Sequence, residues 1–169
     1  MALALAVLPL GSARAEAFPP MVPPEGFAKT RLVGEWFEVA ATPWFLEKDC
    51  HGTTVSVATR EDSRLVFKLA CRKGSLDGKV VHIEGLLAEV EPGVFALRLV
   101  RLAEVRVTLI VLWQAEDDSM AVIAAPDGTV GWVWSKTAHP DPQALEAAKA
   151  VLAKYGYNPR YIADIDQGK

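Results

Sequence analysis

The side chains in this sequence with the widest chemical repertoire are three histidines and two cysteines. His51, His82 and His139 fall on separate segments. Nucleophilic and metal-dependent sites need a nucleophile, a base and orienting groups that converge on one point. Two cysteines without C-x-x-C spacing are too few for a zinc cluster. His82 alone would suit axial ligation of a haem, but alternation along its strand points it outward. The sequence therefore predicts no catalytic residue, metal or cofactor, and we expect a protein that is not an enzyme.

The two cysteines favour a different chemistry. Cys50 and Cys71 flank two β-patterned runs, and the polar residues 60–63 between them favour a turn. A hairpin around that turn places the cysteines nearly opposite each other. A disulfide there would close a loop of about twenty residues and add roughly 3 kcal/mol of stability. Two buried free thiols are the alternative.

A glycine, three tryptophans and a lysine form a possible structural group. Gly34 lies two residues before Trp36, and a glycine in such a strand is typical of a place where another group approaches closely. Trp132, Trp134 and Lys136 share one face of a later strand by period-two alternation. Lys136 is then either a cation over the Trp36 ring, in a contact worth roughly 0.5–2 kcal/mol, or a solvated surface lysine.

One carboxylate also occurs at a position that is expected to face the apolar interior. Glu38 shares the inward face of Trp36 by alternation, and a buried carboxylate needs a partner. Lys136 and Arg72 are the candidate partners. A structural ion pair is the better interpretation than a general base.

The elements that must position these residues are about eight short runs with β-type alternation, joined by short turns that suit an antiparallel up-and-down barrel. They cover residues 34–40, 53–59, 65–70, 81–88, 95–100, 105–113, 120–125 and 129–136. Asp141 and Pro142 then begin a helix as N-cap and first helical residue. Gly156 ends it, and residues 161–163 form a short last strand.

Several motifs, in order along the chain, resemble those of lipocalins, and most closely those of the bacterial lipocalin and apolipoprotein D branch. They are Gly34-x-Trp36-Phe37-Glu38 with Pro43-x-Phe45, Cys71 to Gly74, Ala121-Val122-Ile123 before Pro126-Asp127, Trp132 to Thr137, and Tyr155-Gly156-Tyr157. The resemblance implies an all-β fold: an eight-stranded antiparallel up-and-down lipocalin barrel with one C-terminal α-helix packed outside. Similar cysteine positions in bacterial relatives support the disulfide. The family usually has arginine where Lys136 stands, so the charge is kept here and the planar stacking group is lost.

The expected interior is apolar, and a barrel of this size holds either side chains or one small ligand. Ala40 and Gly85 are small, which predicts a partly vacant interior. Trp44 and Phe45 lie in the loop at residues 42–49, where the family has its largest loop, so we expect a flap over the cavity rather than a loop packed on the barrel wall. The predicted ligand-lining set is Ala40, Trp44, Phe45, Val55, Val57, Phe67, Leu69, Ile83, Gly85, Leu87, Phe95, Leu97, Trp132 and Trp134.

Length and composition predict one domain of 169 residues. Residues 1–15 have the pattern of a signal peptide ending in Ala13-Arg14-Ala15, residues 16–28 form a proline-rich lead-in, and residues 29–169 form the barrel. The lipocalin resemblance implies that the lead-in crosses the closed end of the barrel. Many bacterial lipocalins carry an acylated cysteine at the cleavage point. This chain has none there, so we expect a periplasmic or secreted protein without a lipid anchor.

The expected function is binding of a hydrophobic small molecule, a fatty acid, lysophospholipid or similar lipid, for storage, transport or scavenging. A net charge of −3 gives no reason to expect nucleic acid. Peripheral contact with a membrane stays open, and we expect a monomer or weak homodimer. The alternatives are a filled barrel that contacts other proteins through the loop around Trp44 and Phe45, and a lipocalin-fold enzyme acting on a lipid-like substrate.

Overall fold

The structure is a computed structural model that describes residues 19–169. The predicted signal peptide and the first residues of the lead-in lie outside the described residues. The strands are β1 (Gly34–Ala41), β2 (Cys50–Thr59), β3 (Leu65–Lys73), β4 (Val80–Glu91), β5 (Val94–Leu99), β6 (Arg106–Gln114), β7 (Met120–Ala124), β8 (Gly131–Ser135) and β9 (Ala163–Asp164). The helices are η1 (Lys29–Leu32), α1 (Pro142–Lys154) and η2 (Pro159–Tyr161).

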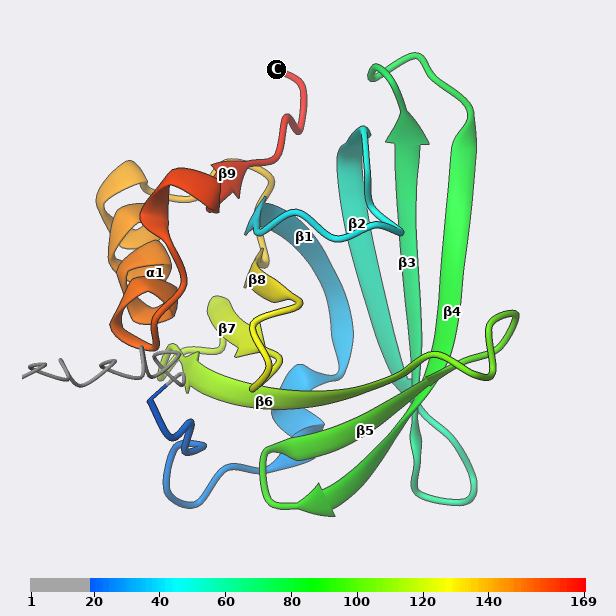
Figure 1. Ribbon diagram of the computed structural model, residues 1–169, viewed down its shortest axis with the longest axis vertical. Coiled ribbons are helices and arrows are strands. Elements are labelled where there is room, and N and C mark those ends of the chain that lie inside the picture. The colour runs from blue at the N-terminus through cyan, green and yellow to red at the C-terminus, as the bar shows by residue number, and fades with distance from the viewer. Residues whose placement is uncertain (1–18) are drawn as a thin grey trace, which may run out of the picture.

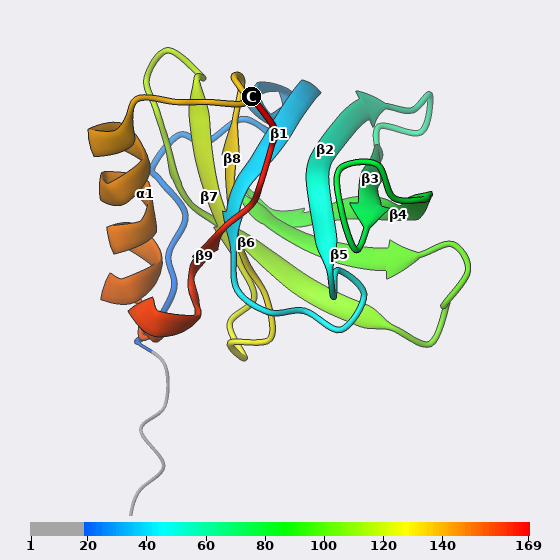
Figure 2. The same cartoon turned by 90° about the horizontal axis from the view of Figure 1, so that it is seen from above.

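The first eight strands form a closed antiparallel barrel. Each pairs with its neighbour along the chain, β8 pairs with β1, and β1 also pairs with β2 to complete the circle. Figure 1 shows strands β2 to β6 curving around the barrel, and in Figure 2 α1 lies outside it beside β7. Among residues 19–169 no helix is long and apolar enough to cross a membrane. The predicted barrel with one external helix is confirmed.

Alternation along the strands separates two hydrophobic clusters. In β3, Leu65, Phe67, Leu69 and Cys71 are buried, and Lys68 between them is exposed. The inward residues of all the strands form the core inside the barrel. A second cluster lies between the barrel and α1 and includes Val133, Ala148 and Leu152.

The helix begins and ends as its sequence predicts. The Asp141 side chain accepts a hydrogen bond of 3.0 Å from the Ala144 amide, and Pro142 stands in the first turn. Gly156 has a φ of 95°, which is typical of glycine after a helix C-terminus. The chain then continues differently from the prediction: residues 159–161 form η2, and the last strand is Ala163–Asp164, paired with the end of β1.

The closed end of the barrel is covered by the lead-in and η1. Phe27 is buried in the barrel core, edge-on to Phe95 with ring centroids 6.4 Å apart. The Trp36 indole donates a 2.8 Å hydrogen bond to the Leu32 carbonyl of η1. Lys136 Nζ lies 3.5 Å from the centroid of the Trp36 ring, which confirms the cation–π interpretation. A Cβ on Gly34 would lie 3.1 Å from this ammonium, so Gly34 is the point of close approach.

A β-bulge in β1 reverses the predicted facing of one residue. Glu38 pairs with Trp134 and Ala40 with Val133, so Val39 is an extra residue in the ladder. Beyond the bulge, Ala41 belongs to the barrel core and Ala40 to the cluster under α1. The prediction that Ala40 faces the interior is therefore wrong, because period-two alternation fails across a bulge.

Candidate binding site at the open end of the barrel

A column of aromatic rings fills the centre of the barrel. The rings of Trp132 and Trp134, from β8, lie 5.9 Å apart. The ring of Phe67, from β3, lies 5.9 and 6.1 Å from them and is nearly parallel to both. Trp36 lies 6.2 Å from Trp134 toward the closed end, and Trp44 lies 5.6 Å from Trp132 toward the open end. These five side chains, here called the aromatic column, are all buried, so the column is part of the hydrophobic core.

Most of the predicted ligand-lining residues belong to the same buried core as this column. Ile83 is partly buried against the same core, and Phe45 is exposed. Those buried together in the barrel core are Trp44, Val55, Val57, Phe67, Leu69, Leu87, Phe95, Leu97, Trp132 and Trp134. The structure therefore brings the set together as packed side chains.

The space expected from two small residues is not there. A Cβ on Gly85 would lie 2.6 Å from the Leu97 Cδ1 atom and 3.0 Å from the Arg98 carbonyl oxygen. Gly85 thus lets β5 approach β4 closely and leaves no vacancy. Ala40 faces α1, as described above. The prediction that these two residues leave room inside the barrel is therefore wrong.

The first hollow, here called the β4 hollow, lies at the open end between β4, the β5–β6 connection and the loop at residues 42–49. Its volume is about 440 Å³, within the range of small-molecule sites. Ile83 is the member of the predicted set that lines it. The apolar lining also includes Leu46, Val81, Leu99 and Leu102, and the polar lining includes Lys79, His82, Glu84 and Arg101.

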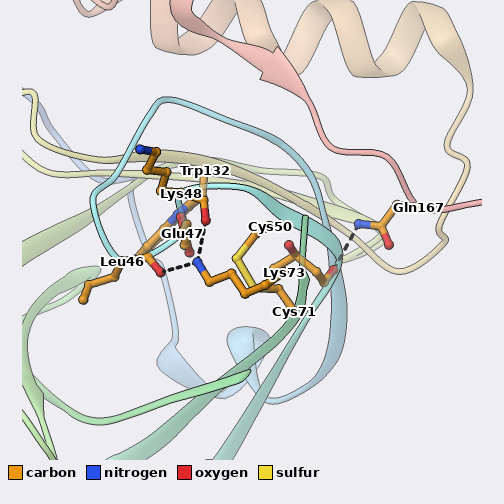
Figure 3. The surroundings of a disulfide bond; sticks show 9 residues. Leu46, Glu47, Lys48, Cys50, Cys71, Lys73, Trp132 and Gln167 are labelled. Carbon is orange, nitrogen blue, oxygen red and sulfur yellow. Dashed lines mark hydrogen bonds between the residues drawn. A yellow bond between two sulfur atoms is a disulfide. The ribbon is translucent and has the colours of Figure 1, made fainter. Parts of the chain in front are cut away.

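The loop at residues 42–49 covers the end of the aromatic column and is held in place by four kinds of contact. Trp44 packs on Trp132, and the Trp132 indole donates a 3.0 Å hydrogen bond to Glu47 Oε2. The Lys73 ammonium donates to the carbonyls of Leu46 and Lys48, as Figure 3 shows. The Cys50–Cys71 disulfide, drawn in the same view, fixes the start of β2 to β3 and confirms the predicted bond. The loop is thus a flap that is anchored to the barrel on both sides.

The second hollow, here called the loop hollow, lies between this loop and the C-terminal segment. It has a volume of about 540 Å³. Two carboxyl groups line it, that of Glu38 from β1 and that of Glu47 from the loop. Its other lining residues are Ala41, Thr42, Pro43, Trp44, Phe45, Lys48, Asp49, Cys50, Ala163, Asp164 and Ile165.

The two glutamates form a buried carboxyl pair. Glu38 is fully buried and Glu47 is 9% exposed. Burial, together with the nearby Glu47 charge, holds the pKa of Glu38 well above its usual value of 4.5. Burial raises the pKa of Glu47 to about 7, although the Trp132 hydrogen bond and the Lys73 charge oppose that rise. Burial therefore favours the protonated form of both carboxyl groups.

The prediction that Glu38 pairs with Lys136 or Arg72 is wrong. Lys136 lies over Trp36 and donates to the Glu35 carbonyl, and Arg72 donates to the Gly78 carbonyl. Glu38 instead faces Glu47. Alternation along β1 identified Glu38 as inward, whereas Glu47 lies in a loop where no periodicity applies, so the sequence held no sign of it.

The remaining candidate residues do not converge. The histidines lie in β2, on the exposed face of β4 and in the link before α1. Within residues 19–169 no group of three or more histidine, cysteine, aspartate or glutamate side chains is placed to hold a metal ion.

Comparison with known proteins places this arrangement in a family. The family described as Lipocalin-like domain matches residues 29–167. The chloroplastic lipocalin of Arabidopsis thaliana is 26% identical over 166 residues, which cover 85% of this chain and 47% of that protein. The chain thus spans about half the length of this curated relative.

Solved structures with low sequence identity share the fold. Lobster apocrustacyanin A1 superposes with a TM-score of 0.66 at 16% identity, over 83% of this chain and 80% of that chain. Insecticyanin from the tobacco hornworm Manduca sexta superposes with a TM-score of 0.65 at 19% identity, over 90% of this chain and 87% of that chain. The family match covers the barrel, α1 and the C-terminal strand, and this chain belongs to the lipocalins.

Proposed function

We propose that this protein binds a hydrophobic molecule with an acidic head group, a fatty acid or lysophospholipid, in the β4 hollow at the open end of the barrel. Lipocalins generally bind small hydrophobic ligands and are binding or transport proteins. The finer assignment rests on one observation: apolar side chains line the β4 hollow together with two cations. Leu99 and Leu102 belong to the apolar lining, and the positive charge of Lys79 and Arg101 exceeds the single negative charge of Glu84.

The expected affinity follows from the apolar contact. A chain of about a dozen methylenes contributes roughly 10 kcal/mol gross at about 0.8 kcal/mol per buried group. Association costs several kcal/mol, which leaves a dissociation constant of roughly 1–100 µM. Apolar walls discriminate poorly between chains that differ by one methylene, so broad specificity for chain length is expected.

The test is calorimetric titration with dodecanoate and with dodecan-1-ol, which has the same chain without the charge. We expect dodecanoate to bind in the micromolar range. Leu102→Glu, which places a negative charge on the hollow's wall, should weaken dodecanoate binding at least tenfold. Val90→Glu, an exposed position at the other end of the barrel, is the matched control and should bind as the unmutated protein does. Equal binding by both variants would refute the proposed site.

The ligand's source requires a separate measurement. Native mass spectrometry of freshly purified protein would identify a bound lipid without prior choice of candidate. A free fatty acid and a lysophospholipid share the acidic head and acyl chain but differ in mass. A bound species with neither feature would contradict the proposal.

A second candidate function is protein binding at the loop around Phe45, whose side chain is 66% exposed. Its neighbour Trp44 is buried, so the exposed apolar area is a single ring. Isolated exposed apolar residues are common on soluble proteins, and this candidate therefore ranks below lipid binding.

The cellular setting of the proposal follows from the sequence. We place the chain in the bacterial lipocalin and apolipoprotein D branch and expect it to be exported to the periplasm or secreted, because residues 1–15 have the pattern of a cleaved signal peptide. It would store, carry or scavenge its lipid there as a monomer or weak homodimer. Mass determination of the mature protein from the periplasmic fraction tests the cleavage after Ala15.

A further inference from the structure

We infer that the loop hollow is a second binding site, with the opposite charge preference, and that it takes a primary alkyl- or arylalkylammonium cation on the Glu38 and Glu47 carboxyl pair. This site is separate from the β4 hollow of the proposed function, and the two have no lining residue in common.

The first argument is the unused hydrogen-bonding capacity of the carboxyl pair. Trp132 Nε1 donates to Glu47 Oε2. The Glu38 and Glu47 side chains share a hydrogen bond. Among the other residues of 19–169, no donor side chain or backbone amide reaches Glu47 Oε1 or either oxygen of Glu38. Carboxylate oxygens buried without donors are costly. An ammonium group carries three N–H donors and a positive charge. It therefore supplies both the hydrogen-bond donors and the opposite charge that the carboxyl pair lacks.

The second argument is the charge around the hollow. Lys73 lowers the pKa of Glu47 by its charge but uses its hydrogen bonds on the carbonyls of the loop. Asp164 on β9 is paired with Lys149 of α1 at 2.8 Å. Asp49 and Lys48, both on the loop, oppose each other in charge. The excess of carboxyl groups over cations on the lining therefore comes from Glu38 and Glu47 themselves.

The third argument is the apolar part of the lining, which selects an organic cation over a metal ion. The rings of Trp44 and Phe45 and the side chain of Ile165 line the hollow beside the carboxyl pair. Aromatic faces attract cations, and apolar side chains accommodate a hydrocarbon body. A calcium ion needs six to eight oxygen ligands, and no group of three or more acidic, histidine or cysteine side chains surrounds this point in the described part of the chain.

Binding should be linked to proton release. The protonated form of the pair is favoured, because both carboxyl groups are buried and face each other. A bound ammonium favours the ionised form of both carboxyl groups. The amine should therefore displace a proton as it binds, and its affinity should rise between pH 6 and pH 8, a range in which a primary amine stays charged.

The experiment compares octylamine, octan-1-ol and octanoate, which share one chain and differ in head group. At pH 8 the full-length protein should bind octylamine at least tenfold more tightly than octan-1-ol. The double variant Glu38→Gln with Glu47→Gln should bind octylamine and octan-1-ol with about equal affinity. Glu84→Gln, which lies in the other hollow, is the matched control and should keep it. Loss of the preference in the control would place the amine in the β4 hollow and overturn the inference.

A second measurement on the unmutated protein covers the case in which the double variant fails to fold. Calorimetry at pH 7 in buffers of different ionisation enthalpy should detect proton release with octylamine and none with octan-1-ol. Equal affinity for the amine and the alcohol, or amine binding without proton release, would refute the site. Octanoate binding should be insensitive to the Glu38→Gln and Glu47→Gln double variant and weakened by Leu102→Glu, so the two proposals fail independently.

Discussion

Replacing Glu47 by glutamine should stabilise the folded protein at alkaline pH and leave its stability almost unchanged at acid pH. The pKa of Glu47 is raised from 4.5 to about 7 in the folded state. Between these values the folded state binds more protons than the unfolded state, so the free energy of unfolding falls as the pH rises through this window. Each pKa unit corresponds to about 1.4 kcal/mol, so the ionised carboxyl costs roughly 3 kcal/mol above pH 7.

Glutamine removes this cost without removing the structural contact. Its amide oxygen can still accept the hydrogen bond from Trp132 Nε1, which Glu47 Oε2 accepts at 3.0 Å. Its amide NH2 also gives Glu38 the donor that it lacks. We therefore expect Glu47→Gln to raise the free energy of unfolding by about 3 kcal/mol at pH 8 and by less than about 1 kcal/mol at pH 4.5.

The assay is urea unfolding followed by tryptophan fluorescence at pH 4.5, 6, 7 and 8. Glu91→Gln, at the exposed end of β4, is the control for loss of one surface carboxylate and should change stability by less than about 0.5 kcal/mol at every pH. The reasoning fails if the gain for Glu47→Gln is the same at pH 4.5 and pH 8, or if the variant is less stable at pH 8. Either result would mean that the charge of Glu47 is solvated or paired in the folded protein.

Three further predictions concern the contacts that hold the barrel together. Replacing Cys50 and Cys71 by serine should lower the free energy of unfolding by about 3 kcal/mol, because the bond closes a loop with a sequence separation of 21 residues; a reducing agent should then have no additional effect in a urea titration. Lys136→Met should cost about 0.5–2 kcal/mol through the lost cation–π contact, and Lys136→Arg should restore most of it; equal stability of the two variants would contradict this role. Gly85→Ala should cost about 1–3 kcal/mol, because the new Cβ would lie 2.6 Å from Leu97 Cδ1. A thermal melt equal to that of the unmutated protein would show that β4 and β5 can separate without penalty.

The barrel could be predicted from this sequence because several local signals agree. Strands with one buried face alternate, turns carry polar residues or glycine, and the helix has an N-cap at Asp141 and a terminating Gly156. The contact of Lys136 with Trp36 also followed from alternation, although a surface lysine was equally consistent with the pattern. These features depend only on short stretches of chain, or on the alternation of side chains along one strand.

The predicted lining of the interior is wrong at two positions, Ala40 and Gly85. At both, the neighbouring strand decides which way the residue faces or how much room it leaves. A bulge at Val39 turned Ala40 outward, and its cause lies in the pairing of β1 with β8 rather than in the local sequence. Gly85 was read as vacant space, but a missing side chain can equally admit a neighbour, and here it admits Leu97. Glu47 was missed because a loop places its side chains by tertiary contacts alone.

The aromatic column occupies the centre of the barrel and so limits where a ligand can enter. Because large rings occupy the centre, a ligand cannot descend along the axis without displacing Trp132 or Phe67, which are fully buried and stacked. We therefore expect binding at the open end, where the flap at residues 42–49 contributes Leu46 to the β4 hollow and Trp44 to the loop hollow. The disulfide and Lys73 fix that flap from the β3 side. One anchored loop thus contributes both to a hollow lined by two cations and to one lined by a buried carboxyl pair. Loosening the loop by reduction of the disulfide should weaken dodecanoate and octylamine binding together.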